Sequence, residues 1–288
     1  MKLALGTVQF GVDYGVANAS GRVSHDEGVR ILQEAWESGI KFLDTAIAYG
    51  ESEQALGEIG VDKWQVVTKL PGIPDSCPDV RGWVKEQTHG SLERLGLQRL
   101  YAVLLHRPEQ LFGDSGPALL KALQDLKTSG QAVKIGVSIY STDELDQLFR
   151  LWRFDLVQAP LNILDRRLVE TGWAQRLNQL GVEVHTRSAF LQGLLLMPSD
   201  QRPHKFDRWD SIWRTWSHWL EDNGMNPLEA CIRYALSIQV VDRVIVGVDS
   251  VGQLRQILTA AVGTLGSLPK WPEPIDRVLL NPASWSQI

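Results

Sequence analysis

The feature that most constrains this 288-residue chain is a set of eight short apolar runs, rich in β-branched residues, that alternate with amphipathic stretches. Runs that are apolar at successive positions are typical of strands covered on both faces, and their alternation with helical patterns indicates parallel βα units. The eight predicted strands are Leu3–Val8, Ile40–Asp44, Gln65–Lys69, Leu100–His106, Ala132–Ser138, Leu156–Pro160, Val182–Arg187 and Arg243–Val246.

Helix signals occupy the intervals between these strands. The segments that begin at Ser24 and at Ser141 both have the S-x-x-E form of a capping box, which marks the start of a helix. After Gly116-Pro117, leucines recur at helical spacing. The chain is therefore expected to alternate strand and helix along most of its length.

Eight βα units can form a closed barrel or an open, doubly wound sheet. The open sheet normally carries a glycine-rich phosphate turn, G-x-G-x-x-G, after its first strand. Here that turn reads Gly6-Thr7-Val8-Gln9-Phe10-Gly11, which does not match. We therefore predict a (β/α)₈ TIM barrel, a fold that typically takes about 250 residues, and we assign residues 1–288 to one domain.

Two segments are longer than the barrel requires. Residues 197–226 form an insertion that carries four tryptophans, at positions 209, 213, 216 and 219, on one predicted helix face. We interpret these indoles as a stripe that packs the insertion onto the barrel, with a wall of the substrate pocket as the alternative. Residues 267–288 are expected to form a C-terminal tail.

Composition and charge exclude several classes of function. A formal net charge of −5 argues against general attraction to nucleic acids or anionic membranes. No run reaches the roughly 18 apolar residues of a membrane span, and the N-terminus lacks a signal-peptide pattern. Cys77 and Cys231 have no metal-ligand spacing, so no metal site is predicted. We expect a cytoplasmic protein, whose oligomeric state the sequence leaves open.

Polar residues end three consecutive predicted strands. Asp44 ends the second, Lys69 the third and His106 the fourth, while Tyr49 follows five residues after Asp44. In a barrel, the C-terminal ends of the strands meet at one rim and supply the catalytic groups. We therefore predict that these four side chains form the active site.

These four side chains suit the delivery of a proton. An ammonium beside a phenol stabilises the phenolate and eases release of the proton, so Lys69 would activate Tyr49. Asp44 would supply the counter-charge that a buried lysine needs, and His106 could orient a carbonyl oxygen. Protonation of a forming alkoxide is half of carbonyl reduction; the hydride must come from a cofactor.

Several segments give this sequence a resemblance to the aldo-keto reductase superfamily, from Leu5 to Ala261. They are Leu5-Gly6-Thr7, Phe42 to Ala46 with Tyr49-Gly50 and Ser52-Glu53, Thr68-Lys69, Leu104 to Arg107, Gly136-Val137-Ser138, Gln158 with Asn162, and Gln192-Gly193-Leu194. The resemblance implies that Tyr49 is the general acid, tuned by Lys69 and Asp44, and that His106 orients a small carbonyl substrate, namely an aldehyde, ketone or sugar.

The same resemblance implies a nicotinamide cofactor, usually NADPH, extended across the barrel rim. It places the carboxamide at Ser138 and Gln158, with Asn162 nearby. The cofactor-binding set that it implies comprises Gly6, Thr7, Asp44, Ser138, Gln158, Arg187, Ser188, Phe190, Gly193, Gly247, Asp249, Ser250 and Gln253. Within that set, the segment from Arg187 would lie along the pyrophosphate and the segment from Gly247 around the adenosine.

This chain departs from the family pattern at three places. Ile139 stands where family members usually have asparagine. Asp249 stands where NADPH-dependent members place a basic residue, and its charge would repel a 2′-phosphate, which leaves NADH open. The usual N-terminal hairpin that plugs the barrel is also missing.

Two other functions remain open. Lys69 could form a Schiff base in a barrel lyase, although Asp44 is expected to keep it charged and unreactive. Alternatively, the barrel could be a non-catalytic nucleotide sensor or scaffold. A scaffold has no need of Tyr49, so the complete set of four residues favours the reductase.

Overall fold

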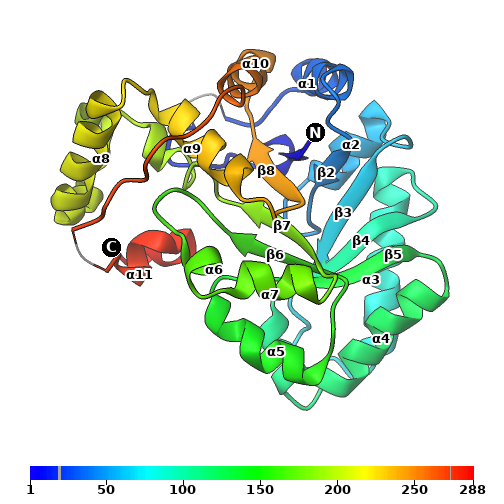
Figure 1. Ribbon diagram of the computed structural model, residues 1–288. Helices are drawn as coiled ribbons and strands as arrows, with labels where there is room; N and C mark the ends of the chain where they lie inside the picture. The colour runs from blue at the N-terminus through cyan, green and yellow to red at the C-terminus, as the bar shows by residue number, and fades with distance from the viewer. Residues whose placement is uncertain (19–20, 273) are drawn as a thin grey trace.

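Eight parallel strands close into a barrel in the order β1 to β8, as the computed structural model of residues 1–18, 21–272 and 274–288 shows (Figure 1). Ala19 and Ser20 in the first loop and Glu273 in the tail lie outside the described residues. The strands are β1 (Leu3–Gly6), β2 (Phe42–Asp44), β3 (Gln65–Leu70), β4 (Leu100–Leu105), β5 (Ala132–Ser138), β6 (Leu156–Pro160), β7 (Glu183–Arg187) and β8 (Arg243–Gly247). The predicted (β/α)₈ barrel is confirmed.

Helices surround the barrel and connect its strands (Figure 1). They are α1 (His25–Glu37), α2 (Ser52–Ile59), α3 (Val80–Leu95), α4 (Gly116–Thr128), α5 (Leu145–Leu151), α6 (Arg167–Glu170), α7 (Trp173–Gln179), α8 (Asp210–Asp222), α9 (Pro227–Ser237), α10 (Val251–Ala260) and α11 (Arg277–Leu280). Ser24 caps α1 by accepting the N–H of Glu27, and Ser141 forms a full capping box before α5. Both predicted helix starts are confirmed. No helix among the described residues has the length and apolar character to cross a membrane.

The first strand is shorter than predicted. β1 ends at Gly6, and Val8–Phe10 forms a short 3₁₀ turn instead of continuing the strand. This turn brings Gly11 against the backbone after β2, where a Cβ on Gly11 would lie 1.8 Å from the carbonyl oxygen of Tyr49. Glycine is required at that close approach, because any side chain on residue 11 would push the Tyr49 loop away from this turn.

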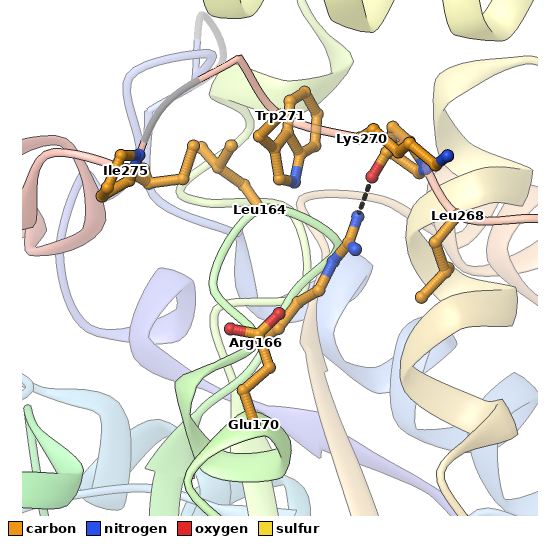
Figure 2. Close-up of a pocket in the computed structure, with 9 residues that line it drawn as sticks. Leu164, Arg166, Glu170, Leu268, Lys270, Trp271 and Ile275 are labelled. Carbon is orange, nitrogen blue, oxygen red and sulfur yellow. Dashed lines mark hydrogen bonds between the residues drawn. The ribbon is translucent and has the colours of Figure 1, made fainter.

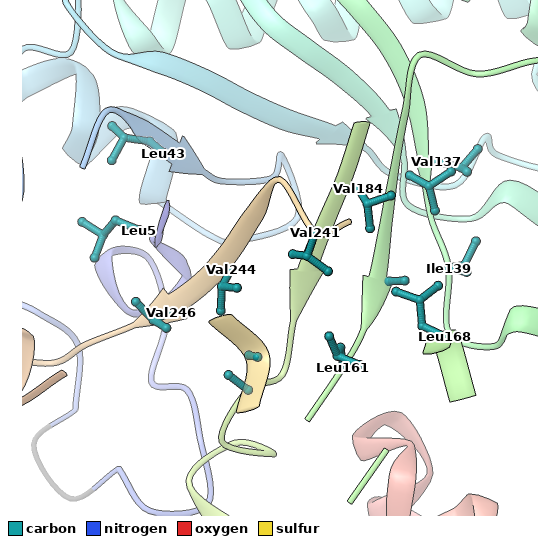
Figure 3. Close-up of a cluster of buried hydrophobic side chains, with 14 of the residues drawn as sticks. Leu5, Leu43, Val137, Ile139, Leu161, Leu168, Val184, Val241, Val244 and Val246 are labelled. Carbon is teal, nitrogen blue, oxygen red and sulfur yellow. The ribbon is translucent and has the colours of Figure 1, made fainter. Parts of the chain in front are cut away.

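The outward faces of the strands form the main apolar core beneath the helices. Leu5, Leu43, Val184 and Val246 are buried in this layer, part of which Figure 3 shows. Burying an aliphatic side chain of this size contributes about 1.5–3 kcal/mol. The barrel is thus a rigid frame for groups at its rim.

The Trp-rich insertion packs on the barrel through its indoles. Trp213 and Trp216 on α8 are buried and donate their indole N–H groups to the carbonyls of Phe206 (2.8 Å) and Leu195 (3.1 Å). Trp219 stacks on Trp216, with ring centroids 5.6 Å apart. The described contacts of these indoles are therefore packing contacts within the insertion and with the segment after β7.

A polar network occupies the N-terminal end of the barrel, where no strand precedes β1 in the described part of the chain. The Glu183 carboxylate accepts the Tyr101 hydroxyl (2.6 Å) and contacts Nε2 of His185 (2.7 Å), and it pairs with the Lys134 ammonium. Burial raises the pKa of Glu183, but the hydrogen bonds from His185, Lys134 and Tyr101 outweigh burial and lower it to about 2. The carboxylate therefore stays ionised in the folded protein.

Glu183→Gln should lower the melting temperature at pH 7 by roughly 5–10 °C, because it leaves buried cationic and polar partners without their carboxylate. The pKa of Glu183 is lower in the folded state than in the unfolded chain, so its contribution is present at neutral pH and declines as the pH falls from about 4.5 towards 2. Thermal melts at pH 7 and pH 3.5 should show a smaller difference between the proteins at pH 3.5.

Glu93→Gln is the matched control, because Glu93 forms an exposed pair with His89. This variant should melt within about 2 °C of the parent. Equal destabilisation by both substitutions would contradict a special role for the network.

Candidate active site

A buried ion pair joins the ends of β2 and β3. The Lys69 ammonium lies 2.7 Å from Oδ2 of Asp44 and also donates to the carbonyl oxygen of Thr45, at 2.9 Å. The Lys69 side chain is fully buried, and that of Asp44 is 7% exposed. The short side-chain distance and the backbone contact fix the ammonium at one point on the rim.

Lys69 remains charged in this environment. Burial by itself would lower the pKa of Lys69, but the charges and hydrogen bonds of Asp44 and Tyr49 hold it above its ordinary value. A Schiff base needs the neutral amine as nucleophile. The arrangement therefore does not favour the lyase alternative.

Tyr49 and His106 complete the group of four. The Tyr49 ring centroid is 5.0 Å from the Lys69 ammonium and 5.9 Å from the His106 ring, which it meets edge-on at 75°. His106 follows β4 directly, and its main-chain N–H donates to the main-chain carbonyl of Leu70 on β3. The structure thus brings together all four side chains that the sequence placed at the rim.

His106 is neutral at physiological pH. Its burial, together with the positive charges of Lys69 and Arg187, lowers its pKa to about 4. A neutral imidazole carries one N–H donor, which is what hydrogen bonding to an uncharged carbonyl oxygen requires. Burial, reinforced by the two cations, therefore keeps the His106 imidazole neutral.

A hydrogen-bond chain crosses the barrel from β2 to β5. The Gln158 amide donates to Oδ1 of Asp44 (2.6 Å), and the Ser138 hydroxyl donates to Oε1 of Gln158 (3.1 Å). The sequence suggested Ser138 and Gln158 as ligands of a carboxamide, and it did not foresee that both are tied to Asp44. Asn162 is also buried, and its side-chain amide donates to the main-chain carbonyl of Ser188 at 3.0 Å.

The segment after β7 has the backbone of an anion-binding loop. Ser188, Leu191 and Gln192 have positive φ angles of 64°, 49° and 54°. Within the described residues, the N–H groups of Ala189 and Phe190 donate to no protein acceptor. Free N–H groups that follow a left-handed residue can form a concave anion site. Gly193 ends the segment against Ala17, whose Cβ a Gly193 side chain would approach to 2.5 Å.

The segment after β8 has a different character, because side chains already occupy its N–H groups. Oε1 of Gln253 accepts the N–H of Asp249 (2.7 Å), and Oε1 of Glu27 on α1 accepts the N–H of Val251 (2.7 Å). Ser250 caps α10 through the N–H of Gln253, at 3.2 Å. Two carboxylates, Asp249 and Glu27, therefore lie at the start of α10.

The remaining predicted cofactor residues lie at the β1 and β8 ends. Gly6 and Gly247 are paired in register, and a Cβ on Gly247 would lie 2.4 Å from the Gln9 amide nitrogen. Oε1 of Gln9 is buried and has no hydrogen-bond partner in the described residues. Thr7 is buried, and its hydroxyl donates to the carbonyl of Asp44 (3.0 Å), so it braces β1 against β2.

A nicotinamide dinucleotide fits this set of groups. The free N–H groups after β7 suit a diphosphate, and the Ser138 hydroxyl and the unpartnered Gln9 carbonyl suit amide or hydroxyl partners. Among the described residues, no group of three or more histidine, cysteine, aspartate or glutamate side chains could hold a metal ion.

Two side chains at the mouth of the site, Tyr14 and Tyr140, were not predicted from the sequence, whereas Arg187 was predicted as a cofactor residue. Arg187 lies with its guanidinium 4.7 Å from the Tyr140 ring centroid, and the Tyr14 hydroxyl accepts the Gln192 amide at 3.1 Å. The direction of the Arg187 side chain follows from strand alternation, so it could have been predicted. Tyr14 and Tyr140 carry no such signal, because they lie in loops.

A surface cavity of about 430 Å³ lies away from these residues, between the loop after β6 and the C-terminal tail (Figure 2). Arg166 crosses it and donates to the carbonyl of Pro269 at 2.9 Å. Trp271 donates to the carbonyl of Ile163 at 3.3 Å. The cavity thus marks where the tail is fastened, and it contains none of the predicted catalytic residues.

The sequence model of the Aldo/keto reductase family matches residues 2–266. The chain belongs to this family. As an aldo/keto reductase it is an NAD(P)-dependent oxidoreductase.

Related proteins agree with this assignment. The chain is 27% identical to D-threo-aldose 1-dehydrogenase of a Pseudomonas species, over 84% of this chain and 86% of the relative. It is 26% identical to L-galactose dehydrogenase of Arabidopsis thaliana, over 96% and 90%. The structure of aldo-keto reductase AKR11C1 from Bacillus halodurans has the same fold, with a TM-score of 0.72, 21% identity and coverage of 97% and 90%.

The low pKa of His106 yields a direct prediction. The imidazole should stay neutral from pH 8 down to about 5 and take up a proton only near pH 4, since burial and two adjacent cations oppose its charge. An NMR titration of the imidazole carbon resonances, with His106→Asn used to assign the signal, measures the midpoint. A midpoint near the ordinary value of about 6.5 would contradict the electrostatic arrangement described above.

Proposed function

We propose that this enzyme reduces a small carbonyl compound, an aldehyde, ketone or sugar, to an alcohol or catalyses the reverse, with Tyr49 as the general acid. The buried Lys69–Asp44 pair beside Tyr49 carries this proposal. Two relatives named as an aldose dehydrogenase and a galactose dehydrogenase support a sugar as substrate.

The residues present account for the proton transfer. A nicotinamide, when bound, would supply the hydride for the carbonyl carbon, and the C=O electron pair would then reside on the oxygen. Tyr49 gives its phenolic proton to that oxygen, and the phenolate left behind lies next to the Lys69 ammonium. His106 orients the oxygen through its N–H. Asp44 keeps Lys69 charged, and solvent returns the proton to Tyr49 after each turnover.

We assign the cofactor to the rim between β5 and β8. Ser138 and Gln158 take the carboxamide end, and the backbone of the segment after β7 takes the diphosphate. The residues assigned to the cofactor are Gly6, Thr7, Asp44, Ser138, Gln158, Arg187 (through its main chain), Ser188, Phe190, Gly193, Gly247, Asp249, Ser250 and Gln253. Thr7 and Asp44 are both buried, so they would support the cofactor site from below the rim.

We also propose that NADH binds at least as tightly as NADPH. The family resemblance alone suggests NADPH, but both arginines near the start of α10 are already paired with carboxylates: Arg30 with Glu27, and Arg255 with Glu34 at 2.7 Å. Asp249 lies beside them and forms no ion pair in the described part of the chain. A 2′-phosphate added there would meet the charge of Asp249 and would have to compete for cations that are already paired.

Tyr49→Phe tests the reductase proposal. It should lower kcat about 10²–10⁴-fold, the usual contribution of a general acid, and leave NADH affinity unchanged. Stopped-flow turnover with a panel of aldehydes and sugars, together with a nicotinamide fluorescence titration, measures both. Tyr101→Phe, which removes a hydroxyl at the opposite end of the barrel, is the control and should keep full activity. Unchanged turnover in Tyr49→Phe would remove Tyr49 from its role.

The cofactor preference has its own test. The double substitution Glu27→Gln with Asp249→Ser should tighten NADPH binding roughly tenfold, since it removes two negative charges near the proposed 2′-phosphate position. NADH affinity should change less than threefold. Glu93→Gln, an exposed carboxylate on α3, is the control. If the native protein already binds NADPH far more tightly than NADH, the proposed preference is wrong.

A further inference from the structure

The inward face of β7 carries three ionisable side chains. Glu183, His185 and Arg187 alternate along the strand, and side chains two apart in a strand point to the same face. Glu183 and His185 contact each other inside the barrel at 2.7 Å. Arg187 is therefore directed over the barrel opening at the catalytic end, and it is half-buried.

The charges of the catalytic end do not balance. Lys69 is neutralised by Asp44, whereas no carboxylate lies within ion-pair distance of Arg187 in the described part of the chain. The Arg187 guanidinium contacts the carbonyl of Ile139 (2.9 Å) and the Ser188 hydroxyl (3.2 Å), both uncharged.

Glu144, whose charge also interacts with Arg187, is engaged elsewhere. Its carboxylate accepts the N–H groups of Tyr140 and Ser141, at 2.9 and 2.8 Å. A half-buried cation without a carboxylate partner is a ready binding site for an anion, and the planar guanidinium can hold a carboxylate or phosphate through paired hydrogen bonds.

Arg187 also faces the same opening as the catalytic groups. Arg187 ends β7, and its guanidinium reaches the Ile139 carbonyl just after β5, so it lies at the same end of the barrel as the catalytic side chains. Its positive charge also helps to lower the pKa of His106. The Tyr140 ring, 4.7 Å from the guanidinium, supports it from one side. An anion bound by Arg187 would thus belong to a molecule that also reaches the catalytic residues.

We propose that Arg187 is a specificity-determining residue that binds an anionic group of the substrate, so that the enzyme favours carbonyl compounds bearing a carboxylate or phosphate. This inference rests on the proposed reductase function. A second source of the same chemistry is the cofactor's diphosphate, because the backbone of Arg187 opens the segment assigned to it. The test has to separate the two sources.

The substrate arm compares aldehydes that differ in one charged group. Butanal is set against 4-oxobutanoate, and glycolaldehyde against glycolaldehyde phosphate. The native enzyme should prefer at least one anionic member by about 10- to 100-fold in kcat/KM, the range for a hydrogen bond to a charged group. Arg187→Met should abolish that preference, mainly through KM, because it should lower kcat/KM for the preferred anionic member at least tenfold more than for its neutral counterpart. Arg187→Lys should retain part of it.

The cofactor arm uses the same variants. NADH affinity, from nicotinamide fluorescence, should stay within threefold of the native value in Arg187→Met. If Arg187→Met binds NADH more weakly and loses kcat/KM equally for neutral and anionic aldehydes, the Arg187 guanidinium binds the cofactor, and the substrate proposal is overturned. Arg107→Met is the matched control, because Arg107 follows His106 but is exposed and paired with Glu109 at 2.7 Å.

A binding arm distinguishes failure of this proposal from failure of the reductase function. Calorimetric titration of the NADH complex with butanoate and with butanamide requires no turnover. Tighter binding of butanoate that disappears in Arg187→Met supports the anion site even if no aldehyde is reduced, which would count against the reductase function alone. Equal binding of both ligands by the native protein overturns the anion site. Melting temperatures within about 3 °C confirm that the variants fold.

Discussion

The buried pair of Lys69 and Asp44 is the interaction on which the rest of the active site depends. Removing two charges from water costs several kcal/mol per ion, and this cost is offset only when every remaining lone pair and proton finds a partner. Oδ1 of Asp44 accepts the Gln158 amide, and the Thr45 carbonyl accepts the Lys69 ammonium. These hydrogen bonds fix the relative positions of β2, β3 and β6. The hydrogen bond from the Ser138 hydroxyl to Gln158 adds β5 to the same network.

The charge of Lys69 also contributes to the protonation state of His106. Burial, reinforced by the positive charges of Lys69 and Arg187, lowers the pKa of His106 and keeps its imidazole neutral. At the opposite end of the barrel, Glu183 compensates the positive charge of Lys134. At the N-terminal end of the barrel the buried charges are therefore paired, whereas at the catalytic end Arg187 has no carboxylate partner in the described residues. An anionic group of a bound molecule can pair with Arg187 there.

Much of this architecture could be predicted from sequence because the decisive signals are local. A strand covered by helices must be apolar along its length, so polar residues at its end, such as Asp44, Lys69 and His106, stand out. The first strand was predicted too long, because Val8 suits a strand as well as the 3₁₀ turn it adopts. The Glu27 contact to Val251 was unpredictable, since it joins segments 224 positions apart. The link from Gln158 to Asp44 also depends on the closure of the barrel.

The fastening of the C-terminal tail connects distant parts of the chain to the rim. The Trp271 indole donates to the carbonyl of Ile163, and the side-chain amide of the adjacent Asn162 donates to the carbonyl of Ser188. Two hydrogen bonds thus link the C-terminal tail, through Ile163 and Asn162, to the segment after β7 that contains the residues with positive φ angles. A substitution in the tail can therefore act on the segment assigned to the cofactor's diphosphate without touching any of the four catalytic side chains.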